Sequence, residues 1–267
     1  IYIKDEQIEE FNQKNIYQPS NFIAPWILYE DNNVLFINKP RGVLVQRDEN
    51  YNEKPLDQMV IEYLMFKGEY DPQNDLAFKP GPAHRIDRNT SGIVIFGKNH
   101  DALAYLFELF QKHELIGKHY LCLVVGDVDR EGTVEVPLRK NFDTKKVVVA
   151  PIKSGAKPAK TVYHPIERFG DYTLLDITLI TGRTHQIRVH MSYIRHHVVG
   201  DGKYGDFQAN NFIEKEYGFK NQFLHAYSVH FGELKAPLNN LSKKSFKAPM
   251  PSEYDDLLNK LRDRKKD

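Results

Sequence analysis

A four-residue apolar run, Ile93–Phe96, is the feature that most constrains how this chain can fold. Glycines bound the run on both sides, and this combination predicts a short, buried strand. The residues just before it are polar and place one carboxylate, Asp87, between Arg85 and Arg88. Because the core holds a loop at the mouth of a buried strand, such a loop can position a reactive group. A structural salt bridge explains the same three residues, although surface pairs contribute only about 0–1 kcal/mol.

Further short apolar segments predict an antiparallel sheet rather than the alternating strands and helices of a doubly wound fold. Residues 26–30 and 34–38 are apolar runs around Asp31-Asn32-Asn33, which is a hairpin signal. The run 118–126 indicates a longer buried strand. We therefore expect an α+β fold with a largely antiparallel mixed sheet and flanking helices. Further strands of this sheet are expected at 132–136, 147–150, 161–169 and 172–181.

Helical spacing of apolar residues marks the segments that flank this sheet. A first helix is expected between Pro55 and Gly68, because Pro and Gly are common at helix starts and ends. Asn99 can cap a second helix and Thr184 a third, and a last helix is expected near the C-terminus. The apolar face of the helix after Asn99 is assigned to Leu103, Leu106, Phe107 and Phe110. That of the helix after Thr184 is assigned to Ile187, Met191 and Ile194, and that of the last helix to Leu257, Leu258 and Leu261.

The composition suits one large or two small globular domains. Of the 267 residues, 41% are hydrophobic and 12% aromatic, which is ample for a sizeable core. No apolar run approaches the roughly 18 residues of a membrane-spanning helix, and no signal-peptide pattern opens the chain. The single cysteine, Cys122, excludes a disulfide framework and suits a reducing compartment. We therefore expect a cytoplasmic protein without a membrane partner.

Charge is distributed unevenly along the chain, although the net charge is only +1. Residues 1–80 hold 8 Lys/Arg and 14 Asp/Glu, whereas residues 81–267 hold 29 and 22. Basic residues are densest between positions 139 and 160. Such a run is usually a solvated surface, but it can also contact the phosphates of a nucleic acid. The candidates for phosphate contacts are Arg139, Lys140, Lys145 and Lys146, followed by Lys153, Lys157 and Lys160.

The polar stretch before the apolar run resembles the H-R-L-D-x-x-T-S-G signature of the RluA-type RNA pseudouridine synthases. Only the Leu of that signature differs, and Ile86 stands in its place. Residues 118–126 match a second family motif, K-x-Y-x-x-x-V-x-G, and residues 182–188 match a third, G-R-x-H-Q-I/L-R. An earlier motif, E-D-x-x-x-x-x-x-N-K-P-x-G, is matched by residues 30–42. The resemblance implies the pseudouridine synthase fold.

The resemblance also implies roles for the residues of these motifs. Asp87 is the catalytic carboxylate, Tyr120 stacks on the target base and is placed to help proton transfer, and Arg188 pairs with Asp87. Arg85 either fills the space that the base leaves in the RNA stack or anchors the loop. The turn that contains Lys39 is expected to pack beneath the active site. The other motif residues expected to contact the substrate are His84, Arg88, Thr90, Arg183, His185 and Gln186.

Resemblance to this family implies conversion of uridine to pseudouridine within RNA. The base leaves C1′ through N1, rotates and rejoins through C5, so no atoms are gained or lost and no cofactor is expected. Asp87 attacks C1′ or the pyrimidine ring, or it deprotonates C2′, and the sequence leaves these alternatives open. The expected partner is RNA, with large-subunit ribosomal RNA ahead of transfer RNA. The protein is expected to be a monomer.

The resemblance covers roughly residues 26–262, so we expect a catalytic domain at 26–267 and a separate segment at 1–25. That segment is polar and without periodicity, which is typical of a linker. The chain does not begin with Met, so we expect a piece of a longer protein. In one branch of the family an S4-type RNA-binding module precedes the catalytic domain, and the segment can be its remnant. Residues 200–205 and 224–226 resemble structural motifs of the family.

Three other functions fit parts of the sequence. The histidines between positions 185 and 197 could suggest zinc, but their spacing fits no common ligand pattern and no metal is expected. A glycoside hydrolase needs a second carboxylate about 5–9.5 Å from the first, and the acids near the motifs are Glu30, Asp31 and Asp201. A non-catalytic RNA-binding assembly factor would share the fold and surface. Release of tritium from C5-labelled uridine distinguishes an enzyme from such a factor.

Overall fold

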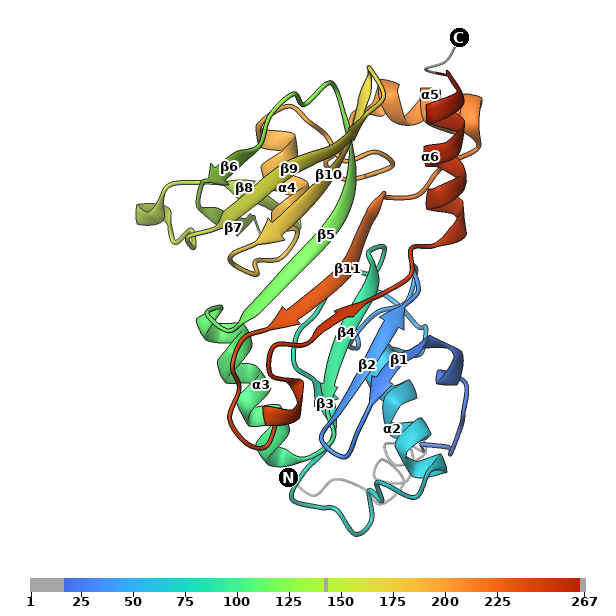
Figure 1. Ribbon diagram of the computed structural model, residues 1–267, viewed down its shortest axis with the longest axis vertical. Helices are drawn as coiled ribbons and strands as arrows, with labels where there is room; N and C mark the ends of the chain where they lie inside the picture. The colour runs from blue at the N-terminus through green and yellow to red at the C-terminus, as the bar shows by residue number, and fades with distance from the viewer. Residues whose placement is uncertain (1–16, 142–143, 265–267) are drawn as a thin grey trace, which may run out of the picture.

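The computed structural model describes residues 17–141 and 144–264, through which one large sheet runs (Figure 1). The strands of this sheet are β1 Ile27–Glu30, β2 Val34–Lys39, β3 Gly81–Pro82, β4 Ser91–Gly97, β5 Ile116–Val125, β6 Gly132–Glu135, β9 Lys160–Arg168, β10 Tyr172–Leu179, β11 Leu224–Phe231 and β12 Ser245–Lys247. Their order is β1-β2-β4-β11-β5-β10-β9-β6, with β12 beside β11 and β3 beside β4. Among these pairs only β4 and β11 run parallel. The predicted α+β fold with a largely antiparallel mixed sheet is confirmed.

Helices flank this sheet at both ends (Figure 1). α2 and α3 lie at the end where β1 to β4 gather, whereas α5 and α6 lie at the opposite end. α4 packs beside β8 and β9. The predicted first and last helices are confirmed. The α-helices of the described residues are α2 Leu56–Phe66, α3 His100–Lys112, α4 Gln186–Tyr193, α5 Phe207–Tyr217 and α6 Ser252–Arg264.

The helix after Asn99 forms as predicted, and of its four predicted inner residues Leu106 is buried and Leu103 and Phe110 pack against the core. The Asn99 side chain accepts a hydrogen bond from the backbone N–H of Ala102 and so caps α3. Phe107, however, is 51% exposed, so its assignment to the inner face was wrong. It follows the buried stripe by one residue, which is about 100° around a helix. The buried residues of α3 are Ala102, Tyr105, Leu106 and Leu109.

Two other segments differ from the prediction. α4 begins after His185, which occupies the N-cap position with a left-handed φ of 54°, so Thr184 is not the cap. Ile187 and Met191 are buried as expected. α5 was not predicted, because Ile213 is its only buried residue and one residue shows no periodicity.

A two-stranded hairpin stands apart from the large sheet. β7, Leu138–Asn141, pairs with β8, Lys146–Val149, in a sheet of their own. The sequence predicted only the second strand and grouped it with the large sheet, so that assignment was wrong. β7 gave no signal because Leu138 is its single apolar residue. Leu138 and Val147 pack against Val189 of α4, which anchors the hairpin on that helix.

The loop that carries Asp87 enters the middle of the large sheet. The predicted strand Ile93–Phe96 is fully buried within β4. Gly92 precedes it at a φ of +111°, and a Cβ there would lie 2.2 Å from the Ala226 carbonyl oxygen of β11. Only glycine therefore permits this approach of the two strands. Ile86 of the loop joins a core cluster that also includes residues of β5 and α4, so these three elements converge.

Residues 1–16 of the predicted N-terminal segment lie outside the described residues. In the remainder of that segment, Ile23 is buried and the Ser20 N–H donates to the Glu62 carbonyl of α2 at 3.1 Å. The division at residue 25 stays a prediction. No helix in the part of the chain that the structure describes is long and apolar enough to span a bilayer.

Candidate active site

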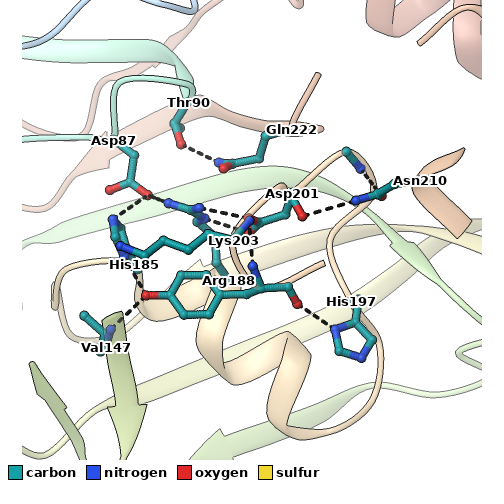
Figure 2. Close-up of polar contacts among 12 residues, drawn as sticks. Asp87, Thr90, Val147, His185, Arg188, His197, Asp201, Lys203, Asn210 and Gln222 are labelled. Carbon is teal, nitrogen blue, oxygen red and sulfur yellow. Dashed lines mark hydrogen bonds and ion pairs between the residues drawn. The ribbon is translucent and has the colours of Figure 1, made fainter. Parts of the chain in front are cut away.

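One arginine holds two carboxylates that are far apart in the sequence (Figure 2). Arg188, in the first turn of α4, donates from Nη1 to Asp87 Oδ2 at 2.8 Å. Its Nε and Nη2 donate to the two oxygens of Asp201 at 2.7 and 2.9 Å. Burial alone would lower the pKa of Arg188, but the hydrogen bonds and charges of the two carboxylates raise it, so the guanidinium stays charged. The structure thus brings Asp87 and Arg188 together as predicted.

Asp201 is the partner that sequence analysis did not assign to the site. Its side chain is fully buried and accepts the backbone N–H groups of Lys203 and Tyr204 at 2.8 and 3.1 Å. Burial alone would raise the pKa of Asp201, but these bonds and the charge of Arg188 lower it. This buried carboxylate fixes the arginine from behind. In the sequence, Asp201 stood in the G-D-x-x-Y-G stretch at 200–205, interpreted as structural, and among the acids near the motifs.

Asp87 remains partly open on the side away from Arg188. Its side chain is 23% exposed. Among the described residues, no donor forms a hydrogen bond with its second oxygen, Oδ1. The main-chain carbonyl of Asp87 accepts the Thr90 N–H at 3.1 Å, which tightens the loop. The carboxylate is therefore oriented through one oxygen and available through the other.

His185 approaches the same carboxylate from α4. Its Nε2 lies 3.9 Å from Asp87 Oδ2, and its Nδ1 lies 2.8 Å from the Tyr204 hydroxyl. That hydroxyl already accepts the Val147 N–H at 2.8 Å, so its own proton is available for Nδ1. The imidazole proton then sits on Nε2 and faces Asp87. Burial lowers the pKa of His185 below its usual 6.5, which keeps the ring neutral at pH 7.

Tyr120 lies on β5 close to this pair. It is buried, and β5 pairs it with Ile177 of β10 and Ala226 of β11. Burial, and to a lesser extent the charge of Asp87, raise the pKa of Tyr120 well above 10. Its phenol is therefore protonated at neutral pH. Two neighbouring strands fix the backbone of Tyr120, and its ring belongs to the core cluster that contains Ile86 and Ile187.

Buried polar contacts anchor the loop from below. Lys39 is fully buried, and its Nζ donates to the carbonyls of Pro40, Val43 and Arg88 at 2.8–3.1 Å. Burial lowers the pKa of Lys39 to about 7, against the opposing charge of Asp87. The turn that contains Lys39 therefore packs beneath the catalytic loop, as expected.

Comparison with known proteins identifies the family. The family model described as RNA pseudouridylate synthase matches residues 33–193. The chain belongs to the RNA pseudouridylate synthase family. It is 35% identical over 242 residues to the ribosomal large subunit pseudouridine synthase D of Yersinia pestis, covering 88% of this chain and 70% of that protein. It is 33% identical over 244 residues to the synthase C of Vibrio cholerae, covering 88% and 69%.

The fold agrees with this membership. The solved structure of human RNA pseudouridylate synthase domain containing 4 superposes with a TM-score of 0.71 at 23% identity, over 90% of this chain and 94% of that one. The chain is thus an RNA pseudouridine synthase, an isomerase of uridine in RNA. The matched region contains Asp87, Tyr120 and Arg188, whereas Asp201 and Tyr204 lie beyond it.

The other residues of the first motif lie in surroundings that differ from those of Asp87. His84 accepts the Ile95 N–H at 3.2 Å and stacks on Phe110, with ring centres 4.3 Å apart. Burial lowers the pKa of His84 to about 3, so the ring is neutral. Arg88 pairs with Glu53 at 2.7 Å. Arg85 is exposed. The predicted contacts of His84 and Arg88 with substrate therefore gain no support from their positions.

Thr90 and Gln186 are buried and bonded within the protein. Thr90 accepts a hydrogen bond from Gln222 Nε2 at 3.1 Å.

Gln186 makes four hydrogen bonds near the start of α4. Its Oε1 accepts from the Thr181 hydroxyl and the Arg183 N–H. Its Nε2 donates to the Lys160 carbonyl and the Thr161 hydroxyl. These positions favour roles in holding the catalytic loop and the start of α4. The exposed Arg183 donates from Nε to the Pro158 carbonyl at 3.0 Å.

The predicted basic strip borders the site. The hairpin β7–β8 and its turn present exposed basic side chains. Val147 of β8 donates its N–H to the Tyr204 hydroxyl, and Lys203 Nζ donates to the Lys145 carbonyl at 2.6 Å. Tyr204 therefore links this hairpin to His185 and so to the carboxylate of Asp87. The exposed basic residues are Arg139, Lys140, Lys145 and Lys146.

Proposed function

We propose that this synthase converts specific uridines of large-subunit ribosomal RNA to pseudouridine, with Asp87 as the catalytic carboxylate. The observation that carries the proposal is the carboxylate itself, which Arg188 holds through Oδ2 at 2.8 Å while Oδ1 stays available. Such a group can act on a substrate without first breaking a bond within the protein. The names of the relatives from Yersinia pestis and Vibrio cholerae support large-subunit ribosomal RNA as the substrate.

The target uridine has to leave its stack before Asp87 can reach it. Eversion of a base costs a few kcal/mol, and stacking on an aromatic ring returns about 1–3 kcal/mol. Tyr120 supplies such a ring beside Asp87. Because its phenol is protonated at neutral pH, Tyr120 can donate a hydrogen bond but is a poor proton acceptor.

Arg85 is suited to fill the gap that the everted base leaves. It stands on the catalytic loop two residues before Asp87 and is exposed. Among the described residues its guanidinium has no hydrogen-bond or ion-pair partner, in contrast to Arg88, which is paired with Glu53. A planar guanidinium stacks readily on bases.

The chemistry is an exchange of bonds at one sugar. The N1–C1′ bond breaks, the uracil rotates, the C5–C1′ bond forms, and the proton on C5 is replaced by one on N1. Asp87 Oδ1 either attacks C1′ or the pyrimidine ring, or removes the proton from C2′. Each route balances in atoms and electrons without a cofactor.

The hairpin β7–β8 would hold the RNA strand next to the site. Its exposed lysines and arginine can contact phosphates, and each contact makes the affinity more sensitive to salt. We also propose that the synthase acts in the cytoplasm, where it would meet ribosomal RNA, and that it acts as a monomer.

Replacing Asp87 with Asn tests the catalytic assignment. Asp87→Asn should reduce tritium release from C5-labelled uridine in RNA by about a thousand-fold or more, because the amide cannot act as a nucleophile or base. RNA affinity should stay within a few-fold. The exposed Asp101→Asn is the matched control and should keep full activity. Turnover retained by Asp87→Asn would move the chemistry to another residue.

A map of pseudouridines tests the RNA class. Ribosomal and transfer RNA are compared between cells with and without this gene. Loss of one or more positions in large-subunit ribosomal RNA supports the proposal. If pseudouridines disappear only from transfer RNA, transfer RNA is the substrate class instead. If no pseudouridine disappears, the proposal is overturned.

A further inference from the structure

Lys118, in the second motif, is a buried cation that the proposed chemistry does not use. It is 8% exposed and faces the same side of β5 as Tyr120, two residues further along the strand. Its Nζ donates to His113 Nδ1 at 3.1 Å and lies 5.7 Å from the centre of the Phe110 ring. No carboxylate of the described residues pairs with it.

The other buried cations of the described residues differ from Lys118 in this respect. Lys98 pairs with Glu30 and Glu69, and Arg188 holds two carboxylates. Lys39 donates to three carbonyl oxygens. A buried charge is costly unless an opposite charge or several dipoles compensate it. Lys118 has a neutral imidazole and the face of the Phe110 ring, neither of which carries a charge. Burial lowers the pKa of Lys118 to about 8, so the ammonium group is still mostly protonated at neutral pH.

A second donor stands beside this ammonium group. His113 ends α3 in the left-handed conformation, with a φ of 60°. Since its Nδ1 accepts from Lys118, its proton sits on Nε2 and can be donated. Burial, with the nearby charges of Lys118 and Arg183, lowers the pKa of His113 to about 4. The third motif also passes here, because a Cβ on Gly182 would lie 4.0 Å from Lys118 Nζ.

We infer that Lys118 and His113 bind one phosphodiester of the RNA strand beside the everted uridine. This inference rests on the proposed function. An anion that compensates Lys118 has to come from outside the described chain, and the substrate is a polyanion. An everted nucleotide stacked on Tyr120 carries a phosphate on each side, and two residues of a strand span about 7 Å. Ammonium and imidazole N–H groups are suitable donors to phosphate oxygens.

Replacement of Lys118 tests this site. The probe is an RNA stem–loop that contains a uridine assigned by the pseudouridine map. Lys118→Met keeps the apolar stem and should weaken RNA binding about ten-fold, lower the slope of log affinity against log salt by about 0.7, and leave kcat within about three-fold. Lys118→Arg should restore most of the affinity. Lys220→Met, at an exposed lysine paired with Glu214, should change neither affinity nor slope.

A scan of the RNA gives an independent result. Single phosphates flanking the uridine are replaced by neutral methylphosphonates. One position should weaken binding to the wild-type synthase about ten-fold and have no further effect with Lys118→Met.

If Lys118→Met keeps the same slope of log affinity against log salt as the wild type, the inference is overturned. If that variant does not fold, the scan of the wild type decides, and no sensitive phosphate within two nucleotides of the uridine rejects the site. Failure of the proposed function is recognised separately, because then no uridine is assigned and the wild type releases no tritium.

Discussion

Arg188 divides its donors unequally between its two partners. Two of its nitrogens bind Asp201 and one binds Asp87, so the arginine is fixed to the fully buried acid and offers its remaining edge to the partly exposed one. We therefore expect Asp201 to act at a distance from the substrate, by orienting the arginine that orients the proposed catalytic carboxylate, Asp87. A bidentate pair restricts the guanidinium more strongly than a single bond does.

Replacing Asp201 with Asn tests this arrangement. The buried guanidinium would lose a compensating charge, so we expect a loss of roughly 3 kcal/mol of stability and a Tm lower by roughly 5–10 °C. Tritium release should fall at least about ten-fold. Thermal unfolding and the release assay measure both effects. Asp171→Asn, whose side chain is 71% exposed, is the control and should shift Tm very little. An unchanged Tm in Asp201→Asn would show that the pair does not stabilise the fold.

At the scale of elements, one phenol connects the hairpin β7–β8 to His185, in addition to the packing of the hairpin on α4. The Tyr204 hydroxyl accepts the Val147 N–H of β8 and contacts His185. The guanidinium of Arg188 also lies 5.1 Å from the centre of the Tyr204 ring. The element that carries the basic side chains and the element that carries the arginine thus meet on the same residue.

Removing that hydroxyl should loosen the hairpin. In Tyr204→Phe the Val147 N–H loses its acceptor, which costs about 1–3 kcal/mol for a buried donor. Hydrogen exchange across residues 138–149 should become faster, whereas exchange in β5 stays slow, and RNA affinity should fall about three- to ten-fold. Tyr193→Phe, at a tyrosine that is 55% exposed, is the matched control. Unchanged exchange in the hairpin would show that packing on α4 alone holds it.

For the whole molecule, buried histidines make the free energy of unfolding depend on pH. The pKa of His84 is lowered to about 3 and that of His225 to about 4, in both cases mainly by burial. An unfolded chain binds protons on these histidines near their ordinary pKa of about 6.5, whereas the folded chain does not. Stability is therefore unaffected above pH 6.5 and falls as the pH drops from about 6.5 towards 4. Each histidine contributes roughly 1 kcal/mol per pH unit.

His84→Gln should reduce this acid sensitivity. Glutamine can still accept the Ile95 N–H but does not titrate. Between pH 6.5 and 5 the variant should lose roughly 2 kcal/mol less stability than the wild type. Urea unfolding at several pH values measures the difference. His100→Gln, where the side chain is 77% exposed, should behave like the wild type. A variant with the wild-type pH dependence would exclude His84 as a source of the effect.

Local patterns were sufficient for most of the elements. The buried strand at Ile93–Phe96, the hairpin around Asp31, and the capped helix after Asn99 each depend on residues close in sequence. The contiguous motifs likewise indicated Asp87 and its pairing with Arg188. Helical periodicity placed Leu103, Leu106 and Phe110 of α3 on the core side. It did not establish how wide that side is, because this depends on what the rest of the chain packs against the helix, and so Phe107 was misassigned.

Beyond the pair of Asp87 and Arg188, only the tertiary structure decided which polar groups meet. Asp201 and Tyr204 complete the site from a loop after α4, and Gln222 reaches Thr90 across 132 residues of sequence. The direction of a side chain was equally undetermined, since His84 belongs to the motif yet stacks on Phe110. Short-range sequence determines backbone preference and chemical type, whereas burial and pairing of a charge depend on segments that folding brings together from far along the chain.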